Sequence, residues 1–268
     1  MNNTLLKGLA LIELLSRAER PLNLTQIGQE LRITKSNVHR LMQALVATRF
    51  VLRDEDSGTY SPSIKLWELG SAVLGKLDLR RHAERPMNAL MEKTGESVHL
   101  SVLDGIEVVY VHKIDSDRPV RAYSQIGGRM PAYCVATGKA QLAFGSERAI
   151  ELACAALQRH TESTITDRDA FLREMRKIRE RGFAINRAEW RKGVWGLAAP
   201  VLDARGSAIA AVGISGPAAG FRKAILPEWS AQVVAAAAAV SDAIGGGQQS
   251  APALGRVRLR AGEERPAS

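Results

Sequence analysis

The chain has 268 residues, 46% of them hydrophobic, which is enough for one large folded domain or two modest ones. Its formal net charge of +9 favours polyanionic partners, but residues 1–75 carry only +2 of it. Two cysteines, Cys134 and Cys154, argue against a disulfide framework or a cysteine-based metal site. Because no signal-like segment or membrane-length apolar run is visible, we expect a cytoplasmic protein without a membrane partner.

The N-terminal quarter predicts three helices. Residues 4–16 form the first, whose apolar side chains recur at helical spacing and predict an inward stripe of Leu5, Leu9 and Ile12. The second helix begins after Asn23, which with Gln26 forms an N-cap signature. About three residues then lead to a third helix, which Thr34 can cap. Two short helices joined in this way are typical of a helix-turn-helix.

The third helix has two different faces. Its apolar residues fall at helical spacing and are expected to pack inward: Val38, Leu41, Met42, Leu45 and Val46. The other side combines short hydrogen-bonding side chains with an arginine: Ser36, Asn37, His39, Arg40 and Gln43. Side chains of this kind suit the base edges and phosphates of a DNA major groove.

A hairpin is predicted directly after this helix, where it would form a wing. Residues 50–53 favour a strand, residues 54–58 favour a turn, and Thr59 and Tyr60 precede Pro62. No acidic residue lies between Glu30 and Asp54, so a basic stripe remains for phosphates. These features favour contacts with double-stranded DNA over the alternative of a helical bundle with a solvated charged face. The expected contacts are Lys35, Ser36, Asn37, His39, Arg40, Gln43 and Arg53.

Residues 63–79 predict a further, unusually apolar helix. Its stripe consists of Leu66, Leu69, Val73 and Leu77. We favour a linker helix that packs against its copy in a dimer, and the alternative is a helix that simply covers its own domain.

The rest of the chain predicts an α+β domain with an antiparallel sheet. Strands are expected at residues 97–103, 107–114, 120–123, 183–187, 194–202 and 208–215, and helices at residues 80–94, 135–144, 147–158, 167–181 and 227–244. The predicted organisation is therefore a winged helix-turn-helix domain (1–62), a linker helix (63–79), a sensor-like domain (80–245) and a disordered tail (246–268).

Several motifs occur in an order that resembles one family. They comprise residues 34–41 in the winged module, then 127–131, 136–143, 181–183, Glu189 with Gly193, 197–200 and 214–217. Together they resemble the isocitrate lyase regulator (IclR) family of bacterial transcription factors, over nearly the whole chain up to about Gly245.

The resemblance implies a winged DNA-binding domain, a linker helix and a GAF-like effector-binding domain with an antiparallel sheet. It also implies a metabolite-responsive regulator, without cofactor, that binds its DNA operator as a homodimer or tetramer. A ligand that prefers one arrangement of the dimer would then change operator affinity. The effector-binding residues that the resemblance implies are Ala136, Thr137, Asn186, Gly196, Gly213 and Ser215. The amides near Ala136 start a helix and could hold a carboxylate.

Three positions differ from family members that sense small 2-oxo acids. Those members tend to have an acidic residue where Asn186 stands, a serine where Gly213 stands, and a histidine near the pocket loop where Tyr133 stands. Because this chain offers fewer polar groups and more room there, we expect a larger organic acid, in particular an aromatic one.

Other constellations are weaker. His99, His112 and Tyr110 lie on neighbouring predicted strands and could line a pocket, but no further ligand stands at metal-binding spacing. We therefore predict neither a metal site nor catalytic residues. Two other functions stay open at this point: an enzyme acting on a small organic acid with a structural N-terminal helical domain, and a module whose basic face binds an acidic protein.

Overall fold

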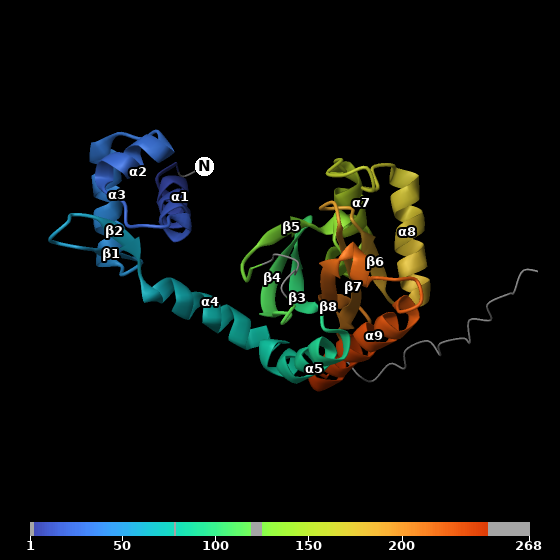
Figure 1. The fold of residues 1–268 in the computed structure, drawn as a ribbon. Coiled ribbons are helices and arrows are strands. Elements are labelled where there is room, and N and C mark those ends of the chain that lie inside the picture. The colour runs from blue at the N-terminus through green and yellow to red at the C-terminus, as the bar shows by residue number, and fades with distance from the viewer. Residues whose placement is uncertain (1–2, 78, 119–124, 246–268) are drawn as a thin grey trace, which may run out of the picture. The chain divides into compact units, whose positions relative to one another are not determined.

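The computed structural model describes residues 3–77, 79–118 and 125–245, with the backbone alone for 71–77 (Figure 1). The described residues form two compact units, which divide after Leu77. The elements of the first unit are α1 (Asn3–Arg17), α2 (Leu24–Leu31), α3 (Lys35–Ala47), β1 (Val51–Arg53), β2 (Tyr60–Pro62) and α4 (Ile64–Leu77). This order is the predicted helix-turn-helix followed by a hairpin.

Local signals set the helix boundaries of the first unit. The Asn23 side chain accepts hydrogen bonds from the Thr25 and Gln26 amides, while the Gln26 side chain accepts from the Asn23 amide. This reciprocal capping confirms the predicted start of α2. Thr34 is the N-cap residue of α3, as predicted, although its side chain makes no capping hydrogen bond.

The core of the first unit corrects the prediction for α1. Leu11 and Leu15 are fully buried, together with Ile27, Val38 and Met42 from the next two helices. Leu5 and Leu9, which we expected inside, are 61% and 50% exposed. With 100° per residue, these two leucines and Ile12 lie on the side of α1 away from Leu11. The helix thus carries two apolar stripes, and only one of them meets α2 and α3.

The hairpin is a two-stranded antiparallel ribbon. Val51 pairs with Pro62 and Arg53 with Tyr60. Its turn is closed by Asp54, whose carboxylate accepts hydrogen bonds from both the backbone amide and the hydroxyl of Ser57. Tyr60 also bridges to Leu22, which ties the hairpin to the chain between α1 and α2. The wing expected from the sequence is therefore present.

The second unit is built on a six-stranded antiparallel sheet with strand order β5-β4-β3-β8-β7-β6. Its strands are β3 (Ser97–Asp104), β4 (Glu107–Ile114), β5 (Arg129–Pro131), β6 (Ala184–Arg187), β7 (Val194–Leu202) and β8 (Ala208–Pro217). Its helices are α5 (Leu79–Thr94), α6 (Ala136–Ala143), α7 (Glu147–Ala155), α8 (Arg168–Arg181) and α9 (Leu226–Ala243), with 3-10 turns η1 (Ala132–Cys134) and η2 (Ala218–Gly220). The predicted α+β class is confirmed.

Helices flank this sheet along its length. Helix α5 packs against β3 and β4, and α9 packs beside it against β7 and β8 (Figure 1). Helix α6 contacts β3, β7 and β8, and α8 covers α6. A continuous apolar core joins α6, α8 and the sheet through Leu142, Phe171 and Ile178. The start of α6 is thereby held against the centre of the sheet.

One strand of the structure was not predicted, and two predicted segments are not tested. The strand expected at 120–123 and the expected disordered tail, 246–268, lie outside the described residues. The short edge strand β5 was not predicted, because three residues that contain a proline give little alternation to detect.

Candidate functional site

Helix α3 presents a polar face to solvent. Five of the predicted contact residues are exposed: Lys35, Ser36, His39, Arg40 and Gln43. Asn37 is half-buried at the edge of this face, and its side-chain oxygen accepts a hydrogen bond of 3.4 Å from Arg40 Nη2. The opposite side of α3 supplies the buried Val38, Leu41 and Met42. Six of the seven residues predicted to bind DNA therefore lie together on one helix.

Arg53 lies on the wing in a different electrostatic setting. Its guanidinium is 3.5 Å from the Glu55 carboxylate, and both side chains are largely exposed. Asp54 and Asp56 add two more acidic side chains to the tip of the wing. Hydrogen bonds from Ser57 lower the pKa of Asp54 and keep this carboxylate ionised. Arg53 thus has an acidic neighbourhood that the α3 face does not have.

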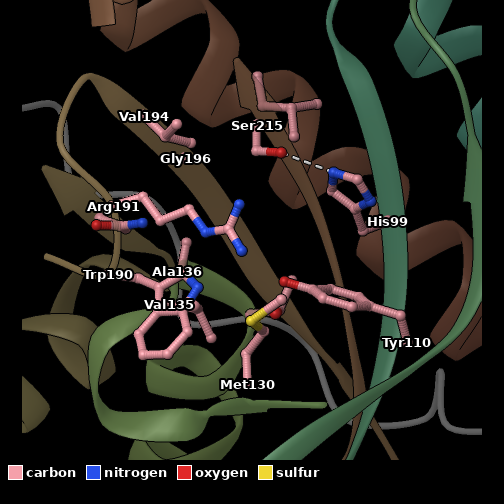
Figure 2. A pocket seen from close by; sticks show the side chains of 13 residues that line it. His99, Tyr110, Met130, Val135, Ala136, Trp190, Arg191, Val194, Gly196 and Ser215 are labelled. Atoms are coloured by element: carbon pink, nitrogen blue, oxygen red, sulfur yellow. Dashed lines mark hydrogen bonds between the residues drawn. The ribbon is translucent and has the colours of Figure 1, made fainter. Parts of the chain in front are cut away.

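The second unit contains a cavity of about 290 Å³. Strands β3, β4, β5, β6, β7 and β8, the start of α6 and the loop between β6 and β7 all contribute to its wall (Figure 2). The lining residues are His99, Tyr110, Met130, Val135, Ala136, Thr137, Asn186, Trp190, Arg191, Val194, Gly196, Ile214 and Ser215. The wall combines an apolar surface with a few convergent polar groups, as ligand sites do.

Five of the six predicted effector residues line this cavity: Ala136, Thr137, Asn186, Gly196 and Ser215. Gly213 stands outside the lining. A Cβ atom there would lie 2.6 Å from the Leu197 carbonyl oxygen and 3.0 Å from the Thr137 methyl group. This glycine therefore lets α6 approach the sheet, which is a packing role beside the cavity.

Sequence reasoning considered His99 and Tyr110 without assigning them, and it missed Trp190 and Arg191. The last two belong to the loop between β6 and β7, where no periodicity marks a functional side chain. An indirect sign that these two residues belong to the pocket was present in the sequence, since their loop joins two strands that carry predicted pocket residues. Tyr133, expected near the pocket, does not line it, because its hydroxyl lies 2.8 Å from Nε2 of His160.

The polar wall formed by His99, Ser215 and Tyr110 is uncharged at neutral pH. His99 Nε2 and the Ser215 hydroxyl are 2.7 Å apart (Figure 2). Burial, reinforced by the Lys113 cation, lowers the pKa of His99 to about 3. Burial raises the pKa of Tyr110 to about 12. These side chains offer hydrogen bonds without attracting or repelling a charged ligand strongly.

The first turn of α6 brings backbone donors to the same cavity. Its N-cap residue, Val135, has an extended backbone and no side-chain capping hydrogen bond. The first amides of a helix have no intrahelical acceptor, and the helix dipole places partial positive charge there. Since Ala136 and Thr137 line the cavity, this end of α6 can receive an anionic group.

A buried ion pair fixes the loop between β6 and β7 onto α6. Lys139 Nζ lies 2.6 Å from Glu189 Oε1 and 2.7 Å from the Ile185 carbonyl oxygen. Burial raises the pKa of Glu189, which the Lys139 cation partly offsets. The Glu189 amide in turn donates to the Asn186 side-chain oxygen over 2.8 Å. This arrangement leaves the Asn186 NH₂ group as its available polar end.

His112 has a structural partner in place of a ligand-binding role. Its Nε2 lies 2.5 Å from a carboxylate oxygen of Glu84 on α5, and it does not line the cavity.

In the part of the chain that the structure describes, no group of three potential metal-binding side chains comes together. The described helices also include none that is long and apolar enough to span a bilayer.

A winged helix-turn-helix with an exposed polar face, followed by an α+β domain with a partly apolar cavity, defines a ligand-sensing transcription regulator. Residues 4–55 match the IclR helix-turn-helix domain, and residues 71–242 match the C-terminal domain of bacterial transcriptional regulator IclR. The chain belongs to the IclR family. It is therefore a DNA-binding transcriptional regulator with a C-terminal effector-binding domain, and the enzyme alternative is set aside.

Individual relatives agree with this assignment. The HTH-type transcriptional regulator KdgR of Escherichia coli (strain K12) is 35% identical over 245 residues, which cover 91% of this chain and 93% of KdgR. The crystal structure of Thermotoga maritima IclR has a TM-score of 0.76 at 32% identity, covering 91% of this chain and all of that one. An IclR homologue from Microbacterium hydrocarbonoxydans, crystallised with 4-hydroxybenzoate, has the same fold, with a TM-score of 0.78 at 23% identity, covering 90% and 99% of the two chains.

Proposed function

We propose that this protein is a cytoplasmic regulator whose operator binding responds to a small aromatic carboxylic acid held in the cavity. The observation that carries the proposal is the composition of the wall, where backbone donors and neutral polar side chains interrupt an apolar surface. The cavity volume of about 290 Å³ is near the lower end for ligand pockets, which limits the effector to a small molecule.

The wall suggests how such an acid would lie. Its carboxylate would accept hydrogen bonds from the first amides of α6, beside Ala136. The aromatic ring would pack on Met130, Val135 and Val194, which are apolar residues of the cavity wall. A polar substituent would meet the His99 and Ser215 pair. The 4-hydroxybenzoate in the Microbacterium homologue is consistent with an aromatic acid in this fold.

The operator would be read by α3, with Lys35, Ser36, Asn37, His39, Arg40 and Gln43 as contacts and Arg53 as a weaker one. Arginine and lysine would bind phosphates or guanine, and Asn37 and Gln43 would bind base edges. Arg53 ranks lower because Glu55 competes with phosphate for its guanidinium.

We also propose that the protein acts as a homodimer or a tetramer. In the first unit, apolar side chains remain exposed on α1 and α4: Leu5, Leu9, Ile64, Trp67 and Leu69. Large apolar groups in this number are typical of a surface that a second chain covers. A dimer would place two α3 helices on the half-sites of a palindromic operator, and an effector that prefers one dimer arrangement would change their spacing.

Footprinting tests the proposal directly. The DNA upstream of the protein's own gene is digested with and without the protein, and binding to the protected duplex is then titrated with 4-hydroxybenzoate, benzoate and pyruvate. We expect a protected site whose affinity changes at least about fivefold with an aromatic acid. A protected site that responds to pyruvate alone would overturn the aromatic effector, and a protein without preference over bulk duplex would overturn operator binding.

A further inference from the structure

We propose that Arg191 is the residue that makes this pocket select anionic ligands over neutral ones of the same shape. This inference rests on the proposed function and deepens it, because it names the side chain that reads the ligand's charge. Among the lining residues that the structure describes, Arg191 is the single side chain with a formal charge at neutral pH. Its guanidinium reaches from the loop between β6 and β7 into the space enclosed by His99, Ser215, Tyr110 and Trp190 (Figure 2).

The guanidinium is available for a ligand. The Arg191 side chain makes no hydrogen bond or ion pair with the described residues. By contrast, Nζ of the neighbouring Lys192 lies 3.8 Å from Oε1 of Glu162. The described residues that line the cavity include no acidic one. Asn186 contributes an amide, which carries no charge. Arg191 is thus a positive charge without an acidic counterpart among the described residues of the wall.

The loop that carries Arg191 is held in place before any ligand arrives. Glu189 is 5% exposed and is paired with Lys139, as described above. The Thr164 hydroxyl donates to the Glu189 carbonyl oxygen over 2.6 Å, and the Thr161 hydroxyl donates to the Ala188 carbonyl oxygen over 2.7 Å. Trp190 packs edge-on against His160 with 4.4 Å between ring centroids. These contacts fix the residues that directly precede Arg191, so a ligand does not have to order this part of the loop when it binds.

The chemistry of the guanidinium defines the ligand class. Its planar fork of N–H donors matches a carboxylate in two parallel hydrogen bonds, and such charge-assisted bonds are about twice as strong as neutral ones. The apolar wall would be satisfied equally by an acid, its amide or its methyl ester. Selectivity among these three therefore depends on Arg191, assisted by the amides of α6, and the preferred ligand is a monocarboxylate with an apolar body.

Calorimetric titration of the full-length protein tests this assignment. The probes are 4-hydroxybenzoate, 4-hydroxybenzamide and methyl 4-hydroxybenzoate, which share one ring and differ in charge. The variants are Arg191→Gln and Arg191→Lys, with Lys192→Gln as the matched control, because Lys192 is an exposed cation on the same loop but does not line the cavity. Far-UV circular dichroism checks that each variant is folded, which we expect because Arg191 is exposed.

In the wild type we expect the acid to bind about ten to a hundred times more tightly than the amide or the ester. Arg191→Gln should lose most of that preference by weakening the acid alone, Arg191→Lys should keep part of it, and Lys192→Gln should keep all of it. An Arg191→Gln protein that still prefers the acid as strongly as the wild type overturns the inference and leaves the proposed function standing. A wild type that binds none of the three probes overturns both.

Discussion

At the scale of single residues, Arg40 is the most informative side chain of the DNA-binding unit. It is exposed on the α3 face and donates a hydrogen bond to Asn37, so it can contact DNA and orient a second contact residue. Replacing Arg40 with Ala should weaken operator binding by about 1–3 kcal/mol, because a phosphate or guanine contact is lost. Fluorescence anisotropy with the protected operator duplex measures this change.

The control for this variant is Arg17→Ala, which removes an exposed arginine from the last turn of α1, outside α3 and the wing. It should bind the operator almost as well as the wild type. Equal losses in the two variants would mean that overall charge, and not the α3 face, governs binding.

His99 links the cavity to the pH dependence of stability. Its pKa falls from 6.5 in an exposed histidine to about 3 in the fold, mainly through burial. Below pH 6.5 the unfolded chain therefore takes up a proton at this residue that the folded chain does not accept until about pH 3. We expect the free energy of unfolding to fall as the pH is lowered through this range, with the His99 contribution fully present above pH 6.5.

Urea unfolding of the wild type and of His99→Gln at several pH values between 4 and about 7.5 isolates this contribution. The variant should lose less stability on acidification than the wild type does, even if it starts from a lower value. Parallel curves for the two proteins would show that His99 is not held neutral by the fold.

At the scale of elements, the decisive contact is the one that joins α6 to the loop between β6 and β7. Lys139 is 1% exposed and Glu189 is 5% exposed. Replacing Lys139 with Met should lower the free energy of unfolding by about 3–5 kcal/mol at neutral pH, because the Glu189 carboxylate would remain buried without its counter-ion. Urea unfolding followed by circular dichroism provides the measurement.

Arg168→Met is the matched control, since the ion pair of Arg168 with Glu151 is as short, 2.7 Å, but largely exposed. Solvent screens such a pair, and the stability of this variant should stay close to that of the wild type. If both variants lose the same stability, burial of the Lys139 pair is not what makes it important.

At the scale of the whole molecule, operator binding should be strongly dependent on salt. The basic stripe between Glu30 and Asp54 would neutralise several phosphates and release their counter-ions. We expect affinity for the operator to fall by at least about a hundredfold between 50 and 200 mM salt. Anisotropy titrations over this range test the expectation, and Arg40→Ala should reduce the slope while Lys192→Gln leaves it unchanged. A flat response would contradict phosphate contacts by the α3 face.

The DNA-binding unit was largely predictable from the sequence because its signals are local. The α2 capping box, the helical spacing of Val38 and Met42, and the turn at Asp54 each depend on residues a few positions apart. The prediction of the buried face failed in α1, where two apolar patterns fit helical spacing equally well. Helix α1 carries two leucine stripes, and only contact with α2 and α3 decides that Leu11 is inside and Leu5 outside.

For the sensor unit, the strands and the five lining residues named from the family pattern were within reach of the sequence. The rest of the pocket was not. His99 and Ser215 are 116 positions apart, and they meet because β3 and β8 are neighbours in the sheet. Arg191 lines the cavity from a loop in which Glu189 is bound to Lys139, 50 positions away in the sequence. The sequence by itself determined the class of protein, since hydrophobic periodicity, helix capping and family motifs depend on residues that are close together in the chain. Only the tertiary structure decided which charged side chain lines the cavity, because that depends on pairings between segments distant in sequence.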